Sequence, residues 1–364
     1  MKQIEQKKHK AGKIILVSVG VLLAVIVAAV GGLLIFESVT TLPVKDTEVM
    51  AIHGTSFQKA DQNREIKIVT WNAGYGALDE RQDCYWDGGK GVDGESLATV
   101  QANIGAMKDK IKELDPDVFC LQELDRHSKR SYHYDELDAF EADFGGAYQS
   151  SFARNFKAGF IPVPLYNPTG DVEAGIATFS KFRLSSATRV QLPIPFSWPM
   201  SLVNLKRCLL ITRSPIVCSD KELVIVNLHL EAYDDGEGKI KQLRQLMDFM
   251  QEEYDKGNYV IACGDFNQAF SSADLSKYPR IDEWVCPIID VSAYPDFTFH
   301  MDDNVPTCRS LTKTYSDSDK SKHQYYMLDG FITGNNMTVQ SVETIDLGFQ
   351  NTDHNPVVMS LTLA

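Results

Sequence analysis

The sequence lacks the short motifs that mark several classes of enzyme. None of its seven cysteines belongs to a CxxC pair and there is no HExxH pattern, so the sequence does not indicate a zinc site. It has no P-loop and no GxGxxG fingerprint, which argues against an enzyme with a nucleotide cofactor. It also has no GxSxG elbow, which argues against a serine enzyme of the α/β-hydrolase type.

Basic residues are scarce relative to acidic ones. The chain has 36 Lys and Arg against 49 Asp and Glu, for a formal charge of -13. Tight non-specific binding of nucleic acid depends on clustered Lys and Arg, so this composition argues against it. The odd number of cysteines, with Cys120 and Cys263 in buried-looking strands, does not indicate a disulfide framework. One disulfide bond stays an alternative if the domain lies in an oxidising compartment.

Residues 14–36 form an uncharged and almost wholly apolar run of 23 residues. A helix of that length spans a bilayer core of roughly 30 Å. A cleaved signal peptide has a shorter apolar core, of roughly 7–15 residues, and a small-residue cleavage site. Ala28-Ala29 offers only a weak site of this kind, so we expect a single transmembrane anchor.

The five lysines among residues 1–13 predict a cytoplasmic tail, because positive charge favours that side of the membrane. The remaining chain would then lie outside the cell. We expect a linker over residues 37–64 and one catalytic domain over residues 65–364. Two amphipathic stripes predict helices in that domain, from Leu97 to Leu114 and from Ile240 to Tyr254. Residues 148–196 are rich in Phe, Pro and Asn, and we interpret them as long loops near the mouth of a site.

Six apolar runs carry polar side chains at or near an end. The most informative covers residues 259–267 and reads YVIACGDFN. It predicts a buried strand, a turn at Gly264, and then Asp265 and Asn267 pointing the same way. The other runs cover residues 66–72 (IKIVTWN), 118–123 (VFCLQE), 223–231 (LVIVNLHLE), 326–332 (YMLDGFI) and 352–358 (TDHNPVV). In helix-covered sheets, ligands bind where strands end, so the runs together predict a shared polar floor.

These residue types indicate phosphate ester chemistry. Carboxylates and amides without paired thiols suit a hard divalent cation such as Mg²⁺. His229 and His354 add groups that can hydrogen-bond or exchange protons with a phosphoryl oxygen near neutral pH.

The motifs resemble the endonuclease/exonuclease/phosphatase superfamily, of the deoxyribonuclease I-like type. The resemblance covers about residues 64–364, in the family's order, and residues 175–180 and 306–309 resemble family segments more weakly. Two departures are Leu328-Asp329-Gly330, where many members carry an aromatic residue after the Asp, and an insert over residues 79–93. The resemblance implies an α/β fold: a four-layered α/β/β/α sandwich of two packed mixed sheets, here preceded by one transmembrane helix.

The resemblance also implies a role for each motif residue. Glu123 would be the main ligand of Mg²⁺ or Mn²⁺, with Asn72 beside it and Asp353 facing the metal.

For catalysis, Asp265 would align or deprotonate the attacking water, and Asn267 would hold a phosphoryl oxygen. His229 would contact the phosphate. His354 would be a second catalytic histidine, oriented by Asp329.

Some of these residues also have plain structural interpretations. His229 lies between two leucines, so a core histidine is the alternative to a catalytic one, and a turn cap with Gly330 is the alternative for Asp329. Arg130 and Arg309 are weak candidates for substrate binding, and Arg130 also fits a solvated loop. We interpret most of the other histidines, among them His53, His127, His133, His300 and His323, as ordinary surface or loop residues.

The sequence thus predicts a membrane-anchored, metal-dependent hydrolase of phosphate esters that acts by direct attack of water. Its charge favours small sugar or lipid-headgroup phosphates over DNA. Two alternatives stay open, a nuclease and an inactive, membrane-tethered binding module. Specificity would lie in the loops over residues 73–93, 126–143 and 148–199.

Overall fold

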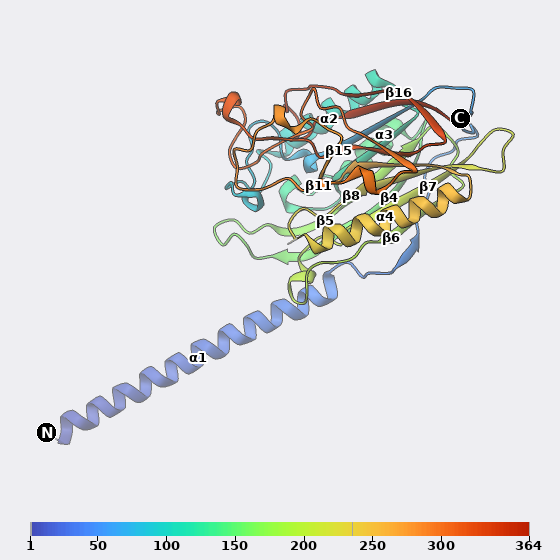
Figure 1. Ribbon diagram of the computed structural model, residues 1–364. Coiled ribbons are helices and arrows are strands. Elements are labelled where there is room, and N and C mark those ends of the chain that lie inside the picture. Colours follow the sequence, from blue (N-terminus) through green and yellow to red (C-terminus); the bar gives the residue numbers. More distant parts are fainter. Residues whose placement is uncertain (1, 235, 364) are drawn as a thin grey trace.

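Two mixed β-sheets form the centre of the computed structural model, which describes residues 2–234 and 236–363 (Figure 1). The six-stranded sheet has the order β16-β17-β2-β3-β5-β4. Its strands are β2 (Ile66–Asn72), β3 (Val118–Asp125), β4 (Gln149–Ile161), β5 (Gly170–Ser180), β16 (Met337–Thr344) and β17 (Val357–Leu363).

The seven-stranded sheet has the order β1-β6-β7-β8-β9-β15-β12. Its strands are β1 (Thr47–Val49), β6 (Ser186–Gln191), β7 (Cys208–Pro215), β8 (Glu222–His229), β9 (Tyr259–Asp265), β12 (Phe297–His300) and β15 (Asp329–Gly334). Two short pairs lie outside these sheets: β10 (Ala269–Phe270) with β11 (Ile288–Ile289), and β13 (Cys308–Arg309) with β14 (Tyr325–Tyr326).

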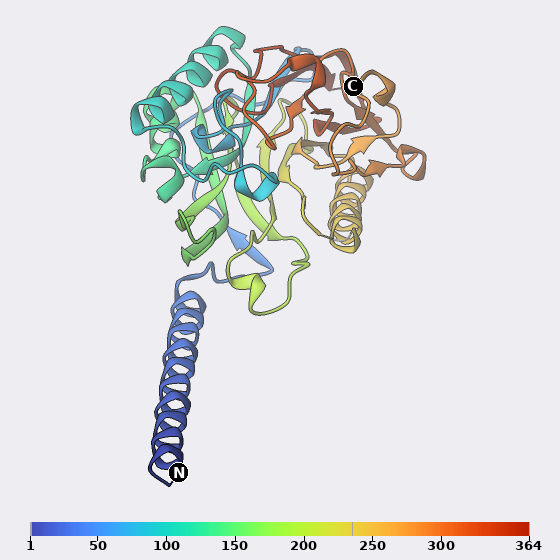
Figure 2. The same cartoon turned by 90° about the vertical axis from the view of Figure 1, so that its left-hand side faces the viewer.

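Helices cover the outer faces of both sheets, which confirms the four-layered sandwich. Helices α2 (Leu97–Leu114) and α3 (Glu136–Phe144) pack on the six-stranded sheet, and α4 (Glu237–Asp255) packs on the seven-stranded sheet. Figure 2 shows the teal α2 and α3 on one side and the gold α4 on the other. A third apolar cluster fills the space between the sheets, with side chains from β2, β3, β8, β9, β15 and β17.

The two long helices form where their amphipathic stripes predict. Helix α2 begins at Ser96, whose side chain accepts a hydrogen bond from the backbone N of Thr99, and ends at Asp115 in the left-handed conformation. Helix α4 buries most of its predicted stripe, but Ile240 is 62% exposed and does not belong to it.

Strand direction brings the polar residues to one edge of the sandwich. Strands β2 and β3 are parallel, as are β8 and β9, so their carboxyl ends point the same way within each sheet. Strands β15 and β17 run antiparallel to β9 and β2, so their amino-terminal ends reach that same edge. Asp329 begins β15 and His354 precedes β17, and both therefore join the strand ends.

The prediction of a turn at Gly264 is wrong. Gly264 lies inside β9, opposite Leu228 and Gly330, with a φ of 146°. A Cβ atom there would lie 1.9 Å from the backbone oxygen of Leu228. The glycine is therefore required by the close approach of two strands and not by a turn.

Residues 148–196, interpreted above as long loops, instead form β4, β5 and β6. Strand β4 alternates buried and more exposed residues over much of its length, as a sheet strand does. The local richness in Phe, Pro and Asn therefore obscured a strand pattern.

The prediction of a linker over residues 37–64 also needs correction. Helix α1 (Lys2–Thr40) continues past residue 36, and Glu37, only 2% exposed, accepts hydrogen bonds from the backbone N atoms of Gly159 and Phe160 at 3.0 and 2.7 Å. Strand β1 then pairs with β6 at the sheet edge, and Ala60 is fully buried. These residues belong to the folded domain because they fill its edge.

Within the described residues, one helix is long and apolar enough to cross a membrane, over Gly12–Thr40. Its first part projects away from the domain in both views (Figures 1 and 2). A signal sequence near the amino terminus would meet the same criteria. The helix therefore supports a membrane anchor without deciding the topology.

We predict that Gly264→Ala destabilises the protein by at least about 3 kcal/mol, because its Cβ would overlap the Leu228 carbonyl. Gly105→Ala is the matched control, since Gly105 lies in α2 and its Cβ would meet no atom within 4 Å. It should stabilise the protein by about 0.5–1 kcal/mol. Urea unfolding of the detergent-solubilised chain measures both changes, and equal midpoints would contradict the prediction.

Candidate active site

A pocket of about 1030 Å³ opens over the converging strand ends. Six of the eight motif residues assigned catalytic or metal-binding roles line it: Glu123, His229, Asp265, Asn267, Asp353 and His354. The other two, Asn72 and Asp329, are 1% and 0% exposed and lie behind this lining, in contact with it. The fold thus brings together residues separated by up to 282 positions (Asn72 to His354).

Asp265 is the centre of the hydrogen-bond network. Its Oδ2 accepts a hydrogen bond from Asn72 Nδ2 at 3.1 Å, and its Oδ1 accepts one from the backbone N of Asn267 at 2.8 Å. His229 Nε2 lies 3.4 Å from Asp265 Oδ2 and 3.7 Å from Glu123 Oε1. Since Asn72 ends β2 and Asp265 ends β9, this network joins the two sheets at the floor of the pocket.

His354 is held from two sides. Its Nδ1 lies 2.7 Å from Asp329 Oδ2, and its backbone oxygen accepts a hydrogen bond from Trp71 Nε1 at 2.9 Å. Its Nε2 faces Asp265 Oδ2 and Asp353 Oδ2, each at 3.8 Å. Asp329 thus sits where a residue orienting His354 must sit, and it does not cap a turn.

Two site residues adopt a strained backbone. Glu123 has a φ of 55° and Asn267 a φ of 50°, in the left-handed region that few non-glycine residues occupy. Glu123 also lies where the pairing of β3 with β5 shifts register, between Leu121 and Leu124. Such bulges re-aim side chains next to active sites, and Glu123 here lines the pocket.

Burial and close charges shift the ionisation of the acidic groups. Burial, followed by the charge of Asp353, raises the pKa of Glu123 to about 8. Burial, followed by the charge of Asp329, raises the pKa of Asp265 to about 6. These shifts mean that the closely spaced carboxyl groups of the pocket are costly to ionise.

The two histidines are shifted in opposite directions. Burial, then the charges of Arg207 and His354, holds the pKa of His229 well below its usual range. Burial is the largest single effect on His354 and opposes its protonation, but the charges of Asp329, Cys308 and Asp353 and the hydrogen bond to Asp329 together raise the pKa of His354 well above its usual range. One imidazole is therefore neutral and the other cationic near neutral pH.

The donor set fits a hard divalent cation. Glu123 and Asp353 offer carboxylate oxygens, and Asn72 Oδ1 keeps a lone pair beyond the one that accepts from Gly74 N at 3.0 Å. A bound cation would favour the ionised form of these carboxyl groups. A neighbouring buried group, Cys308, Asp353 and His354, also has ligand atoms within 4.8 Å of one another.

The two arginines proposed for substrate binding, Arg130 and Arg309, both line the pocket, and neighbouring protein groups hold each of them. Arg130 does not lie in a solvated loop, because its guanidinium pairs with Asp125 at 2.9 Å and lies 3.2 Å above the Tyr75 ring, in the pocket wall. Arg309 is 1% exposed, and its Nη2 donates to the backbone oxygen of Asp79 at 2.6 Å. It therefore holds the start of the insert over residues 79–93.

Arg207 is a pocket residue that sequence reasoning missed. It is 2% exposed, lines the pocket, and lies 3.9 Å from Glu231 Oε2. Its Nε and Nη1 have no hydrogen-bond partner among the described residues. A guanidinium in a pocket wall, with donors that no hydrogen bond uses, is suited to an anion such as a phosphoryl group. No motif surrounds Arg207, so only its burial in the folded chain reveals it.

The sandwich and its pocket define a member of the superfamily whose enzymes are generally metal-dependent phosphodiesterases, nucleases or phosphatases. A sequence model of the Endonuclease/Exonuclease/phosphatase family matches residues 69–354, and the chain belongs to this family. No curated protein matches the chain at a significant level.

Solved structures agree with this fold at low sequence identity. An endonuclease/exonuclease/phosphatase from Beutenbergia cavernae is 18% identical, covering 83% of this chain and 72% of its own, with a TM-score of 0.54. The human Nocturnin catalytic domain with bound sulfate is 16% identical, covering 86% of this chain and 97% of its own, with a TM-score of 0.52. A Bacteroides vulgatus member is 14% identical, covering 83% and 100%, with a TM-score of 0.52.

We predict that Arg207→Gln weakens the binding of inorganic phosphate by roughly tenfold, because charge-assisted hydrogen bonds contribute about 1.5–3 kcal/mol. Isothermal titration calorimetry of the detergent-solubilised chain measures the affinity. Arg183→Gln is the control, because Arg183 is exposed and does not line the pocket. Equal phosphate affinities in the two variants would show that Arg207 does not bind the anion.

Proposed function

We propose that this protein hydrolyses phosphate esters by direct attack of water, with lipid headgroups at the membrane surface as its substrates. The observation that carries the proposal is the arrangement around Asp265, where carboxylates, an amide, a neutral imidazole and a cationic imidazole face one pocket. That set can neutralise phosphoryl charge, activate a water and protonate a leaving oxygen.

Glu123, Asp353 and Asn72 would hold Mg²⁺ or Mn²⁺, which supplies Lewis-acid stabilisation of the phosphoryl oxygens when bound. Asp265 accepts the proton of the attacking water, since a pKa of about 6 leaves it mostly ionised at neutral pH. His354, oriented by Asp329, donates a proton from Nε2 to the substrate.

The neighbouring groups would bind the phosphoryl group. Asn267 uses one amide N–H on the Leu230 carbonyl, at 2.9 Å, and keeps its second N–H for a phosphoryl oxygen. Arg207 offers its unpaired donors from the pocket wall.

The position of α1 supports a substrate in the membrane. Glu37 binds the main chain of β4, and Thr41 Oγ1 donates to the Leu202 carbonyl at 2.9 Å. Both partner segments also line the pocket, through Phe156 and Ile161 of β4 and through several residues of the 196–205 segment. Pocket-lining segments therefore contact the end of the apolar helix, where that helix meets the domain.

Exposed aromatic side chains accompany this opening. Phe160, whose backbone N donates to Glu37, has a side chain that is 40% exposed. Trp198 of the 196–205 segment is 64% exposed. We call this pair the aromatic rim. Aromatic residues favour the membrane interface, so the rim would sit against the headgroups. The five lysines of residues 1–13 favour a cytoplasmic amino terminus and thus an extracytoplasmic pocket.

We predict hydrolysis of a soluble aryl phosphodiester or phosphomonoester with Mg²⁺ or Mn²⁺, and loss of that activity with EDTA. Asp265→Ala and Glu123→Ala should each lower kcat by at least about 10²-fold, since both touch the reacting groups. Glu113→Ala is the control, because its side chain is 68% exposed on α2. Unchanged turnover in both site variants would refute the mechanism, and binding without turnover under every metal would favour an inactive binding module.

We further predict that Phe160→Ala with Trp198→Ala lowers turnover of phospholipid in vesicles by roughly tenfold and leaves turnover of the soluble ester unchanged, because the rim contributes apolar burial in the bilayer. Phe57→Ala is the control, because Phe57 is an aromatic residue that is 88% exposed but is not part of the aromatic rim. Its neighbour Ser56 donates a hydrogen bond to the carbonyl of Lys181, the residue that follows the carboxyl end of β5. The same assay on intact cells given external vesicles tests whether the pocket faces outward. Turnover of the vesicle lipid by intact cells is expected if the pocket is extracytoplasmic. Cleavage of plasmid DNA in preference to vesicle lipid would favour a nuclease.

A further inference from the structure

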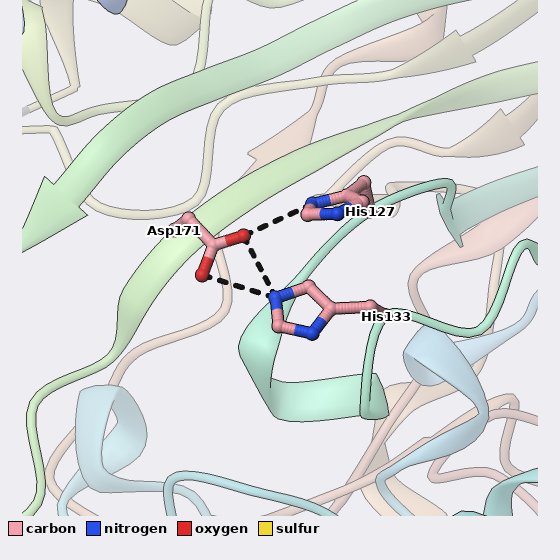
Figure 3. A group of neighbouring side chains, drawn as sticks. All are labelled: His127, His133 and Asp171. Carbon is pink, nitrogen blue, oxygen red and sulfur yellow. Dashed lines mark hydrogen bonds and ion pairs between the residues drawn. The ribbon is translucent and has the colours of Figure 1, made fainter.

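Two histidines interpreted from the sequence as ordinary surface residues meet at one carboxylate. His127 follows β3, His133 follows a short 3₁₀ turn over Lys129–Ser131, and Asp171 is the second residue of β5. Figure 3 shows both imidazoles directed at the Asp171 carboxylate. His127 Nδ1 lies 3.1 Å from Asp171 Oδ2, and His133 Nε2 lies 2.9 Å from the same oxygen.

Two of the three distances between these ligand atoms are compatible with the coordination shell of a tetrahedral metal ion. Zinc binds imidazole nitrogen and carboxylate oxygen at about 2.0–2.2 Å, so neighbouring ligand atoms lie about 3.3 Å apart. The two nitrogen-to-oxygen distances here, 3.1 and 2.9 Å, are close to that value. All three ligand atoms lie within 4.8 Å of one another.

The local packing brings the two rings together before any ion binds. Their centroids are 4.2 Å apart, with an angle of 40° between the ring planes. His133 has a φ of 56°, as has Tyr132 before it, and its backbone N donates to the Ser128 carbonyl at 2.8 Å. A left-handed conformation in two successive non-glycine residues is unfavourable in isolation. The turn thus places the His133 ring beside the His127 ring.

The donor types select a different metal from the one expected in the pocket. Neutral imidazole suits Zn²⁺, Cu²⁺ and Ni²⁺, whereas Mg²⁺ prefers oxygen donors. Two imidazoles and one carboxylate leave a fourth position for water. The side chains of His127, His133 and Asp171 are 65%, 45% and 36% exposed, so an ion can reach them.

We infer that His127, His133 and Asp171 form a second metal site, which binds a zinc-class divalent ion and fastens the 127–133 loop to β5. Without the ion, both ring nitrogens contact Asp171 directly. When the ion binds, each imidazole and the Asp171 carboxylate form one bond to it in place of those contacts. The loop also carries Arg130, whose guanidinium forms part of the pocket wall. Occupancy of the second site would therefore stiffen one wall of the pocket, and it does not depend on the proposed hydrolysis.

The test measures zinc bound to the full-length chain, made without a histidine tag, stripped with EDTA and dialysed against Zn²⁺ in excess Mg²⁺. Because Cys308, Asp353 and His354 also offer ligands, the decisive quantity is the difference in bound zinc per chain between variants. Inductively coupled plasma mass spectrometry measures it. His127→Ala and His133→Ala should each lose one equivalent of zinc relative to the unaltered chain.

His53→Ala is the matched control, since its side chain is 59% exposed and lies 3.9 Å from a single carboxylate, that of Glu141. It should keep the full zinc content. Zinc should also raise the thermal unfolding midpoint of the control and of the unaltered chain more than that of either site variant, while the zinc-free midpoints agree. Equal zinc content in all four proteins, or no zinc-dependent difference in midpoint, would overturn the inference.

Discussion

Burial of four carboxyl groups at one edge of the sandwich is the constraint on which the rest of the site depends. Glu123, Asp265, Asp329 and Asp353 are all held where few waters can solvate their charge. The imidazolium of His354 neutralises part of this charge, and the raised pKa values of Glu123 and Asp265 favour their uncharged forms. Enzymes of this family generally use divalent metals, and these carboxylates are the oxygen ligands that such an ion prefers.

The same edge depends on polar contacts between the sheets. Asn72 reaches Asp265 from the opposite sheet, and deeper in the sandwich Gln122 Nε2 donates to Asn227 Oδ1 at 2.8 Å. Asn227 also donates to the Ala177 carbonyl at 2.8 Å. Buried polar groups that satisfy one another in this way fix the relative position of two sheets. Gln122 and Asn227 therefore support the site without lining it.

The contact between helix and domain fixes the end of the apolar helix against β4, a strand that also lines the pocket. A flexible linker would have let the domain turn freely, whereas Glu37 ties the helix end to β4 within one residue of the apolar run. Gly159 permits this approach, because a Cβ there would lie 2.5 Å from the Phe36 ring. The end of the apolar helix thus lies close to the pocket-lining residues of β4, and this contact supports the proposed lipid substrate.

The sequence by itself determined the local chemistry of this protein: the polar ends of its strands, the amphipathic helices α2 and α4, and the long apolar helix. Such features depend on periodicity and residue type within a few positions, which a sequence displays directly. Only the tertiary structure decided the rest. Gly264 is needed because of a carbonyl on another strand. Arg207 matters because it is buried in the pocket wall with donors that no hydrogen bond uses, and His127 and His133 matter because a turn brings both rings to Asp171. Each of these depends on distances between segments far apart in the chain, and no short stretch of sequence encodes those distances.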